Sequence, residues 1–118
     1  MRRALAAGLL LALAAPASAA SPKPPVAIGI AQREFHITAY RKAVKPGAVR
    51  LNVQNYGEDT HNLVVRGPRG YRLQGPDVLP GEHDTINAKL LRRGTYLLIC
   101  TRANHEQLGM KTKITVRR

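Results

Sequence analysis

The chain has 118 residues, of which 44% are apolar and 22% are charged, a composition typical of a globular protein and not of a disordered or collagen-like one. One domain is expected at this length, and most large enzyme folds, including the (β/α)₈ barrel, are excluded. Nineteen Lys and Arg residues against seven Asp and Glu residues give a net charge of +12.

Residues 1–19 have the pattern of a secretory signal peptide. Arg2 and Arg3 give a positive start, an apolar run follows from Ala4 to Ala15, and Ala17-Ser18-Ala19 supplies the small residues of a cleavage site. The run is shorter than the ~18 apolar residues that indicate a membrane-spanning helix, so we expect cleavage after Ala19. The Ala- and Leu-rich composition is typical of bacterial signals and predicts a periplasmic protein, with a secreted or cell-surface protein as the alternative.

Residues 20–25 are Pro-rich and predict a short stiff linker. Beyond it, residues 26–118 alternate turn signals such as Pro46-Gly47 and Pro80-Gly81 with short stretches of β-branched and apolar residues. Residues 87–93 are expected to form a helical turn or a loop. Several short strands with regular turns predict an all-β sandwich. The expected strands are Val26–Ile30, Glu34–Tyr40, Val49–Asn55, His61–Arg66, His83–Ala88, Thr95–Cys100 and Thr112–Val116.

The chain contains a single cysteine, although small exported domains often use disulfides. An intramolecular bridge is therefore impossible, and the thiol is intermolecular, free or held by another group. Cys100 ends an apolar strand, and His105 and Met110 follow it with four residues in each interval. The loop before the next strand thus carries a thiolate, an imidazole and a thioether.

These donors predict a copper site. Thiolate and thioether are soft ligands that suit Cu(I), imidazole suits copper more generally, and a trigonal His₂Cys set with a weak axial Met is the blue-copper arrangement. Taken singly, Cys100 would be a buried apolar residue, and only the joint spacing favours a metal. The second histidine is expected to be His61, which opens an apolar stretch after a turn; His36 and His83 are the alternatives.

Three blocks of sequence resemble the cupredoxins, the small blue copper proteins such as azurin, plastocyanin and pseudoazurin. They are residues 53–57 before His61-Asn62, Leu79-Pro80-Gly81-Glu82, and Gly94-Thr95-Tyr96 through Cys100, His105 and Met110. The resemblance covers residues 26–116 and implies a Greek-key β-sandwich. It also implies one copper ion with His61, Cys100 and His105 as strong equatorial ligands and Met110 as the axial one.

The resemblance further implies a contact that locks the site. In the family, the Asn after the first His bonds the segment around the Cys, so Asn62 and Thr101 are the candidates. The chain departs from the family pattern at Ala103-Asn104, where many members have Gly or Pro-Gly; Asn104 is expected to take the left-handed backbone there. Arg102 adds a charge to a region that is often apolar in the family.

The resulting prediction is an exported one-electron carrier that cycles copper between Cu(II) and Cu(I), and not an enzyme. The resemblance implies that electrons pass through the exposed edge of His105, with Ala103, Leu108 and Gly109 in a docking face. The alternatives are a periplasmic copper transport or resistance protein and a non-copper domain of the same fold.

The charge of the chain bears on its partners. Loss of Arg2 and Arg3 with the signal lowers the net charge from +12 to +10. This excess predicts an acidic redox partner or an anionic membrane surface, unless it serves only solubility. The export signal argues against a nucleic acid, and a monomer is expected.

Overall fold

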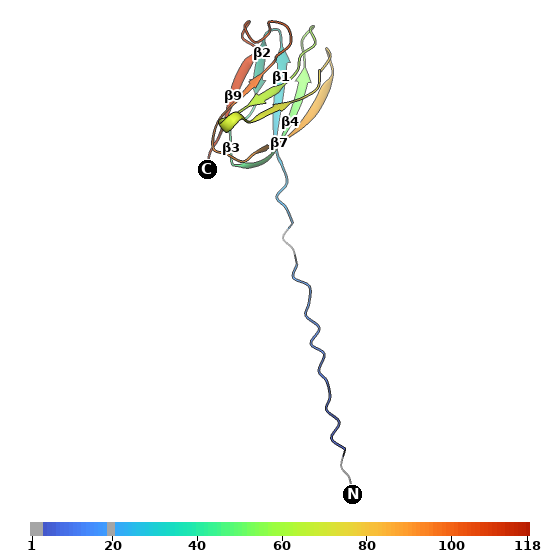
Figure 1. Cartoon of the computed structure of the whole chain (residues 1–118). Helices are drawn as coiled ribbons and strands as arrows, with labels where there is room; N and C mark the ends of the chain where they lie inside the picture. The colour runs from blue at the N-terminus through green and yellow to red at the C-terminus, as the bar shows by residue number, and fades with distance from the viewer. Residues whose placement is uncertain (1–3, 19–20) are drawn as a thin grey trace.

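A computed structural model describes residues 4–18 and 21–118 of the chain. Residues 4–18 are exposed, have no secondary structure and extend away from the rest of the chain (Figure 1). The expected cleavage position after Ala19 lies outside the described residues. Among the residues that are described, no helix is long and apolar enough to cross a membrane.

Two β-sheets pack face to face, which confirms the predicted all-β sandwich. The four-stranded sheet has the order β2-β1-β4-β7, and the five-stranded sheet has the order β3-β9-β8-β5-β6. Strand β1 runs parallel to β4, and β3 runs parallel to β9, while the other pairs are antiparallel. The elements are β1 (Val26–Arg33), β2 (His36–Ala39), β3 (Ala43–Val44), β4 (Gly47–Asn55), β5 (Val64–Arg66), the 3₁₀ helix η1 (Pro68–Gly70), β6 (Arg72–Gln74), β7 (His83–Leu90), β8 (Gly94–Ile99) and β9 (Lys111–Val116).

Side-chain alternation determines which face of each strand enters the core. In β4, Val49, Leu51 and Val53 are buried, while Ala48, Arg50 and Asn52 between them are exposed. The same alternation in β7, which lies beside β4, and in β9 of the opposite sheet supplies further core side chains. Burial of one such aliphatic side chain is worth about 1.5–3 kcal/mol. The largest fully buried apolar side chains are Ile28, Ile30, Leu51, Leu63, Leu90, Tyr96, Leu98, Ile99, Met110 and Ile114.

The structure corrects several predicted boundaries. Strand β7 continues to Leu90, so Asn87–Leu90 do not form a helical turn or a loop. The expected strand from His61 is wrong, because β5 begins at Val64 and His61 forms only an isolated bridge with Val78. Strands β3 and β6 were not predicted, since two or three residues show too little alternation to be recognised.

Loops from both sheets meet at one end of the sandwich, although they are far apart in the sequence. Strands β1 and β4 run parallel and pair as far as Gln32 and Asn55. The segment that follows β4 then meets the segment that follows β8, where Asn62 contacts Thr101. These loops lie at the upper end in Figure 1, opposite the end at which the N-terminal segment leaves.

Candidate metal centre

Three donor atoms from distant parts of the chain meet at this end. His61 lies between β4 and β5, Cys100 directly follows β8, and His105 lies in the loop before β9. The Nδ1 atoms of His61 and His105 are 3.2 Å apart, and Cys100 Sγ lies 3.9 Å from His61 Nδ1 and 3.5 Å from His105 Nδ1. All three residues are buried, and their candidate ligand atoms lie within 4.8 Å of one another.

Met110, the fourth predicted ligand, is fully buried and closes the same loop. Its backbone N–H donates to His105 O at 3.0 Å, and the N–H of Cys100 donates to Met110 O at 3.1 Å. Between Cys100 and Met110 the chain forms a turn, in which the His105 N–H donates to Arg102 O, also at 3.0 Å. The loop is thus closed by its own backbone, which brings its Cys, His and Met together as their spacing predicts.

The donor set and its spacing fit a first-row metal ion. Metal–nitrogen and metal–sulfur bonds of about 2.0–2.3 Å put the donors of a trigonal plane roughly 3.4–3.9 Å apart, close to the distances found here. Two imidazoles, one thiolate and a weak thioether are the donors of a type 1 copper site. His61, Cys100, His105 and Met110 therefore form a type 1 copper-like site.

The predicted contact between Asn62 and Thr101 is present. Asn62 Nδ2 donates to Thr101 Oγ1 at 2.9 Å, and the Thr101 backbone N–H donates to Asn62 Oδ1 at 2.8 Å. Each residue directly follows a cluster residue, His61 in one case and Cys100 in the other. The pair of hydrogen bonds therefore ties the His61 segment to the loop that carries the thiol.

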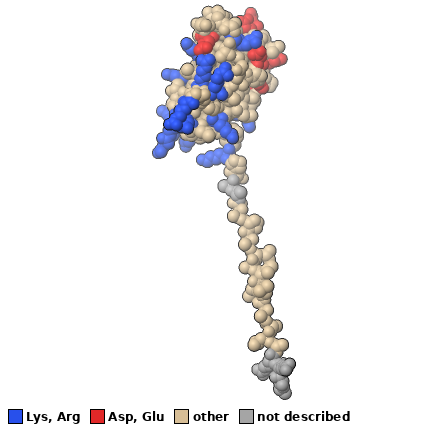
Figure 2. Space-filling view, in the orientation of Figure 1, with Lys and Arg blue, Asp and Glu red and all other residues tan. Residues whose placement is uncertain are grey.

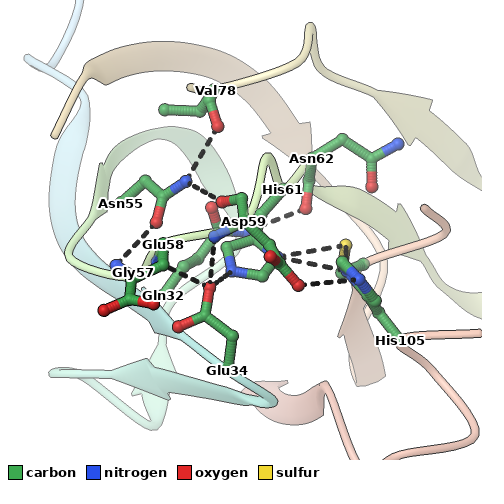
Figure 3. A network of polar contacts seen from close by, with 11 residues as sticks. Gln32, Glu34, Asn55, Gly57, Glu58, Asp59, His61, Asn62, Val78 and His105 are labelled. Carbon is green, nitrogen blue, oxygen red and sulfur yellow. Dashed lines mark hydrogen bonds and ion pairs between the residues drawn. The ribbon is translucent and has the colours of Figure 1, made fainter. Parts of the chain in front are cut away.

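The carboxylate of Glu34, which the sequence did not reveal, contacts Nε2 of His61, the ring nitrogen that does not belong to the donor cluster. His61 Nε2 lies 3.1 Å from Glu34 Oε1, which also accepts hydrogen bonds from the N–H groups of Glu58 at 2.8 Å and Asp59 at 2.6 Å (Figure 3). The hydrogen bond from the Asp59 backbone is the largest cause that lowers the pKa of Glu34. An ionised carboxylate only accepts hydrogen bonds, so His61 carries its proton on Nε2 and has a lone pair on Nδ1.

The protonation state of His61 suits a metal ligand. Burial lowers the pKa of His61, while the hydrogen bond and the charge of Glu34 act in the opposite direction. The net direction is downward, which favours the neutral imidazole. Only that form offers a lone pair to a metal ion.

His105 forms the side of the cluster that is nearest to solvent. Its side chain is 10% exposed, and its Nε2 lies 3.6 Å from Asp59 Oδ2. The ring of Phe35 packs against the imidazole with 5.0 Å between centroids. The exposed edge of this histidine therefore borders on a carboxylate as well as on an aromatic ring.

The surface around His105 is more polar than the resemblance implies. A shallow depression next to the imidazole is lined by Asp59, Thr60, Thr101, Arg102 and Ala103. Arg102 pairs with Asp77 at 2.8 Å beside it. The predicted docking residues Ala103, Leu108 and Gly109 are exposed.

The structure corrects the expectation for the backbone before His105 and decides between the candidate histidines. The residue with left-handed backbone before His105 is Ala103, with φ of 44°, and not Asn104 as expected. Left-handed backbone is sterically costly for alanine, so the loop imposes this conformation on it. The alternative histidines, His36 and His83, are exposed at the starts of β2 and β7 and do not belong to the cluster.

Buried amides organise the segments on both sides of His61, and sequence reasoning missed them. Asn55 Nδ2 donates to Asp59 O at 2.8 Å and to Val78 O at 2.9 Å, and Gln32 Nε2 donates to Asn62 O at 2.8 Å. Asn55 continues the buried face of β4, and a polar residue in that register was the signal that could have identified it. Glu34 offered no such signal, because its contact with His61 spans 27 residues.

Comparison with known proteins gives structural neighbours only. No protein-family model and no curated protein sequence matches the chain. The similar solved structures include a dithionite-reduced auracyanin from the photosynthetic bacterium Roseiflexus castenholzii, with 22% identity and a TM-score of 0.69 over 81% of this chain and 100% of that one. Auracyanin A, a "blue" copper protein from Chloroflexus aurantiacus, has 22% identity and a TM-score of 0.68 over 80% and 100% of the two chains. Auracyanin B has 19% identity and a TM-score of 0.66 over 86% and 96%. These similarities, together with the two packed sheets, show that the chain has the cupredoxin fold.

Proposed function

We propose that the protein is a blue copper protein that carries one electron at a time. The observation that carries this proposal is the convergence of two imidazole Nδ1 atoms and one cysteine sulfur in a buried cluster. Auracyanin A, one of its structural neighbours, is described as a blue copper protein. Copper bound to these residues would supply a one-electron centre that cycles between Cu(II) and Cu(I).

The residues of the chain would hold the donors in place before the metal arrives. Strand β8 and the backbone-closed loop position Cys100 and His105, and Met110 would add a thioether donor. Glu34 and Asn62 restrain the segment that carries His61. A site that is already formed changes little in shape between the two oxidation states, which favours fast outer-sphere electron transfer.

Electrons would enter and leave through His105, since it is the cluster residue nearest to solvent. The donor set offers no open position for a substrate, so the protein would act as a carrier and not as an enzyme. A redox protein would dock over Ala103, Leu108 and Gly109, which are exposed around this histidine. Asp59 and Glu106 also lie there, and they do not favour the acidic partner that the net charge suggests.

Reconstitution with Cu(II) tests the proposal. The purified protein should bind one copper ion and acquire the strong visible absorption of a thiolate-to-copper transition. Cys100→Ser should lose this absorption, while the matched control His83→Gln, an exposed histidine outside the cluster, should keep it. A protein that is loaded with copper and stays colourless, or a C100S spectrum equal to that of the wild type, would contradict the proposal.

The same preparation separates electron transfer from copper transport. An electron carrier should retain its copper after reduction and after reoxidation. A transport or resistance protein should release Cu(I) to a chelator or to an acceptor protein soon after reduction. Copper retention through repeated redox cycles is the result that we expect.

We also infer that the protein is exported and that residues 1–19 are removed. The pattern of Arg2 and Arg3, the apolar run and the small residues before the cleavage position support this inference. The linker at residues 20–25 would then precede a monomeric copper-binding domain at residues 26–118, in the periplasm. The N-terminal sequence of the protein isolated from a periplasmic fraction tests this, and it should begin at Ala20.

A further inference from the structure

Charges of opposite sign lie at opposite ends of the sandwich. The metal end is defined here as the segments 33–36, 54–63, 75–84 and 100–111, which surround the cluster. All seven acidic residues of the chain lie in these segments, together with only three basic residues, Arg33, Arg102 and Lys111. The acidic residues are Glu34, Glu58, Asp59, Asp77, Glu82, Asp84 and Glu106.

The far end is defined as the segments 21–25, 40–46, 67–71, 91–93 and 117–118, which connect the strands opposite the cluster or flank them. These segments contain basic residues and no acidic residue. On the face shown in Figure 2, Asp and Glu gather near the top of the sandwich, while Lys and Arg extend over its middle and lower parts. The basic residues of the far end are Lys23, Arg41, Lys42, Lys45, Arg69, Arg92, Arg93, Arg117 and Arg118.

A cleft opens at the far end between the start of β1, the start of β4 and the C-terminus. It has a volume of about 510 Å³, and Lys23, Lys45 and Arg118 line it together with apolar Pro24 and Pro46. Basic and apolar residues in one cleft suit phosphate groups that are attached to a hydrocarbon layer.

We propose that the far end binds an anionic membrane surface, so that the metal end points away from the bilayer. The basic residues belong to loops of both sheets and form a face, which suits an extended surface of phosphates better than a single small anion. The N-terminal segment also leaves the sandwich at this end (Figure 1). This inference goes beyond the proposed function and does not require copper.

An acidic redox protein fits this face less well. Strand β4 alone has 9 residues and spans roughly 30 Å at the usual rise of a strand. A partner on the far end would therefore be separated from His105 by most of the length of the sandwich. Since electron transfer falls steeply with distance, the face that carries the positive charge is not the face that exchanges electrons.

Vesicle binding tests the proposal with residues 20–118, the chain expected after cleavage, which include all the described strands and every core residue. Sedimentation with vesicles of phosphatidylcholine and phosphatidylglycerol should capture the protein, and pure phosphatidylcholine vesicles should not. Higher salt should release it, because screening weakens the attraction. The Lys45→Glu/Arg118→Glu variant should lose about thirtyfold in partition coefficient.

The matched control is Arg33→Glu/Lys111→Glu, which makes the same change in net charge at the metal end. It should bind the anionic vesicles within about threefold of the wild type. Equal losses in the two variants, or equal binding to neutral vesicles, would overturn the proposal. Absence of vesicle binding with saturable binding to poly-glutamate at the far end would also overturn it, in favour of an acidic macromolecule. Failure of the copper site would appear separately, in the visible spectrum.

Discussion

Glu34 both positions His61 and brings a negative charge close to the cluster. Its Oε1 accepts from two backbone N–H groups and from His61 Nε2, so one carboxylate links β1 to the segment that carries a proposed copper ligand. Such a partner orients the imidazole and raises its basicity. It also places a negative charge one imidazole ring away from the proposed copper ion.

Replacement of Glu34 by Gln should raise the reduction potential of the copper site. The negative charge stabilises Cu(II) relative to Cu(I), and its removal should change their balance by about 1 kcal/mol, or on the order of 50 mV for one electron. A redox titration of the loaded protein measures the change. Glu58→Gln removes an exposed carboxylate from the segment between β4 and β5, which carries His61, and is the control. Equal potentials in E34Q and the wild type would show that the Glu34 charge does not reach the metal.

At the scale of the elements, strict alternation made the fold predictable. Val49, Leu51 and Val53 occupy one face of β4 as the sequence indicated, and the convergence of Cys100 and His105 followed from their place after a strand. The edge strands β3 and β6 could not be predicted from alternation, because they have only two and three residues. Long-range polar contacts could not be predicted either, because no local pattern connects Glu34 with His61.

The alternation in β8 makes a prediction that two neighbouring leucines can test. Leu98 is 0% exposed in the core, whereas Leu97, on the other face of the strand, is 41% exposed. Leu98→Ala should lower the free energy of unfolding by about 2–5 kcal/mol, because it leaves a cavity between the sheets. Leu97→Ala should cost roughly 0.5 kcal/mol or less. Urea unfolding of the copper-free proteins measures both changes in free energy. Similar values for the two variants would mean that the register of β8 does not place Leu98 in the core and Leu97 outside it.

Over the whole molecule, the proposed electron route and the basic surface lie at opposite ends of the sandwich. The proposed electron route leaves at His105, where Asp59 lies 3.6 Å from the imidazole, while the charged residues of the far end are all basic. At physiological ionic strength charges act over about 8 Å in solvent. A partner at the metal end would therefore respond to the few charges around His105 and only weakly to the net charge of the protein.

Small redox reagents can separate this local charge from the net charge. Asp59→Asn should slow electron exchange with a cationic metal complex by roughly twofold to fivefold and accelerate exchange with an anionic one. A change in reduction potential alone would move the two rates in the same direction when both complexes act as oxidants, so opposite changes identify an electrostatic effect at the contact surface. Lys45→Gln at the far end should change neither rate by more than a small fraction. Stopped-flow kinetics at physiological ionic strength measure these rates. If Lys45→Gln altered both rates as strongly as Asp59→Asn, electrons would not leave through the edge of His105 that Asp59 borders.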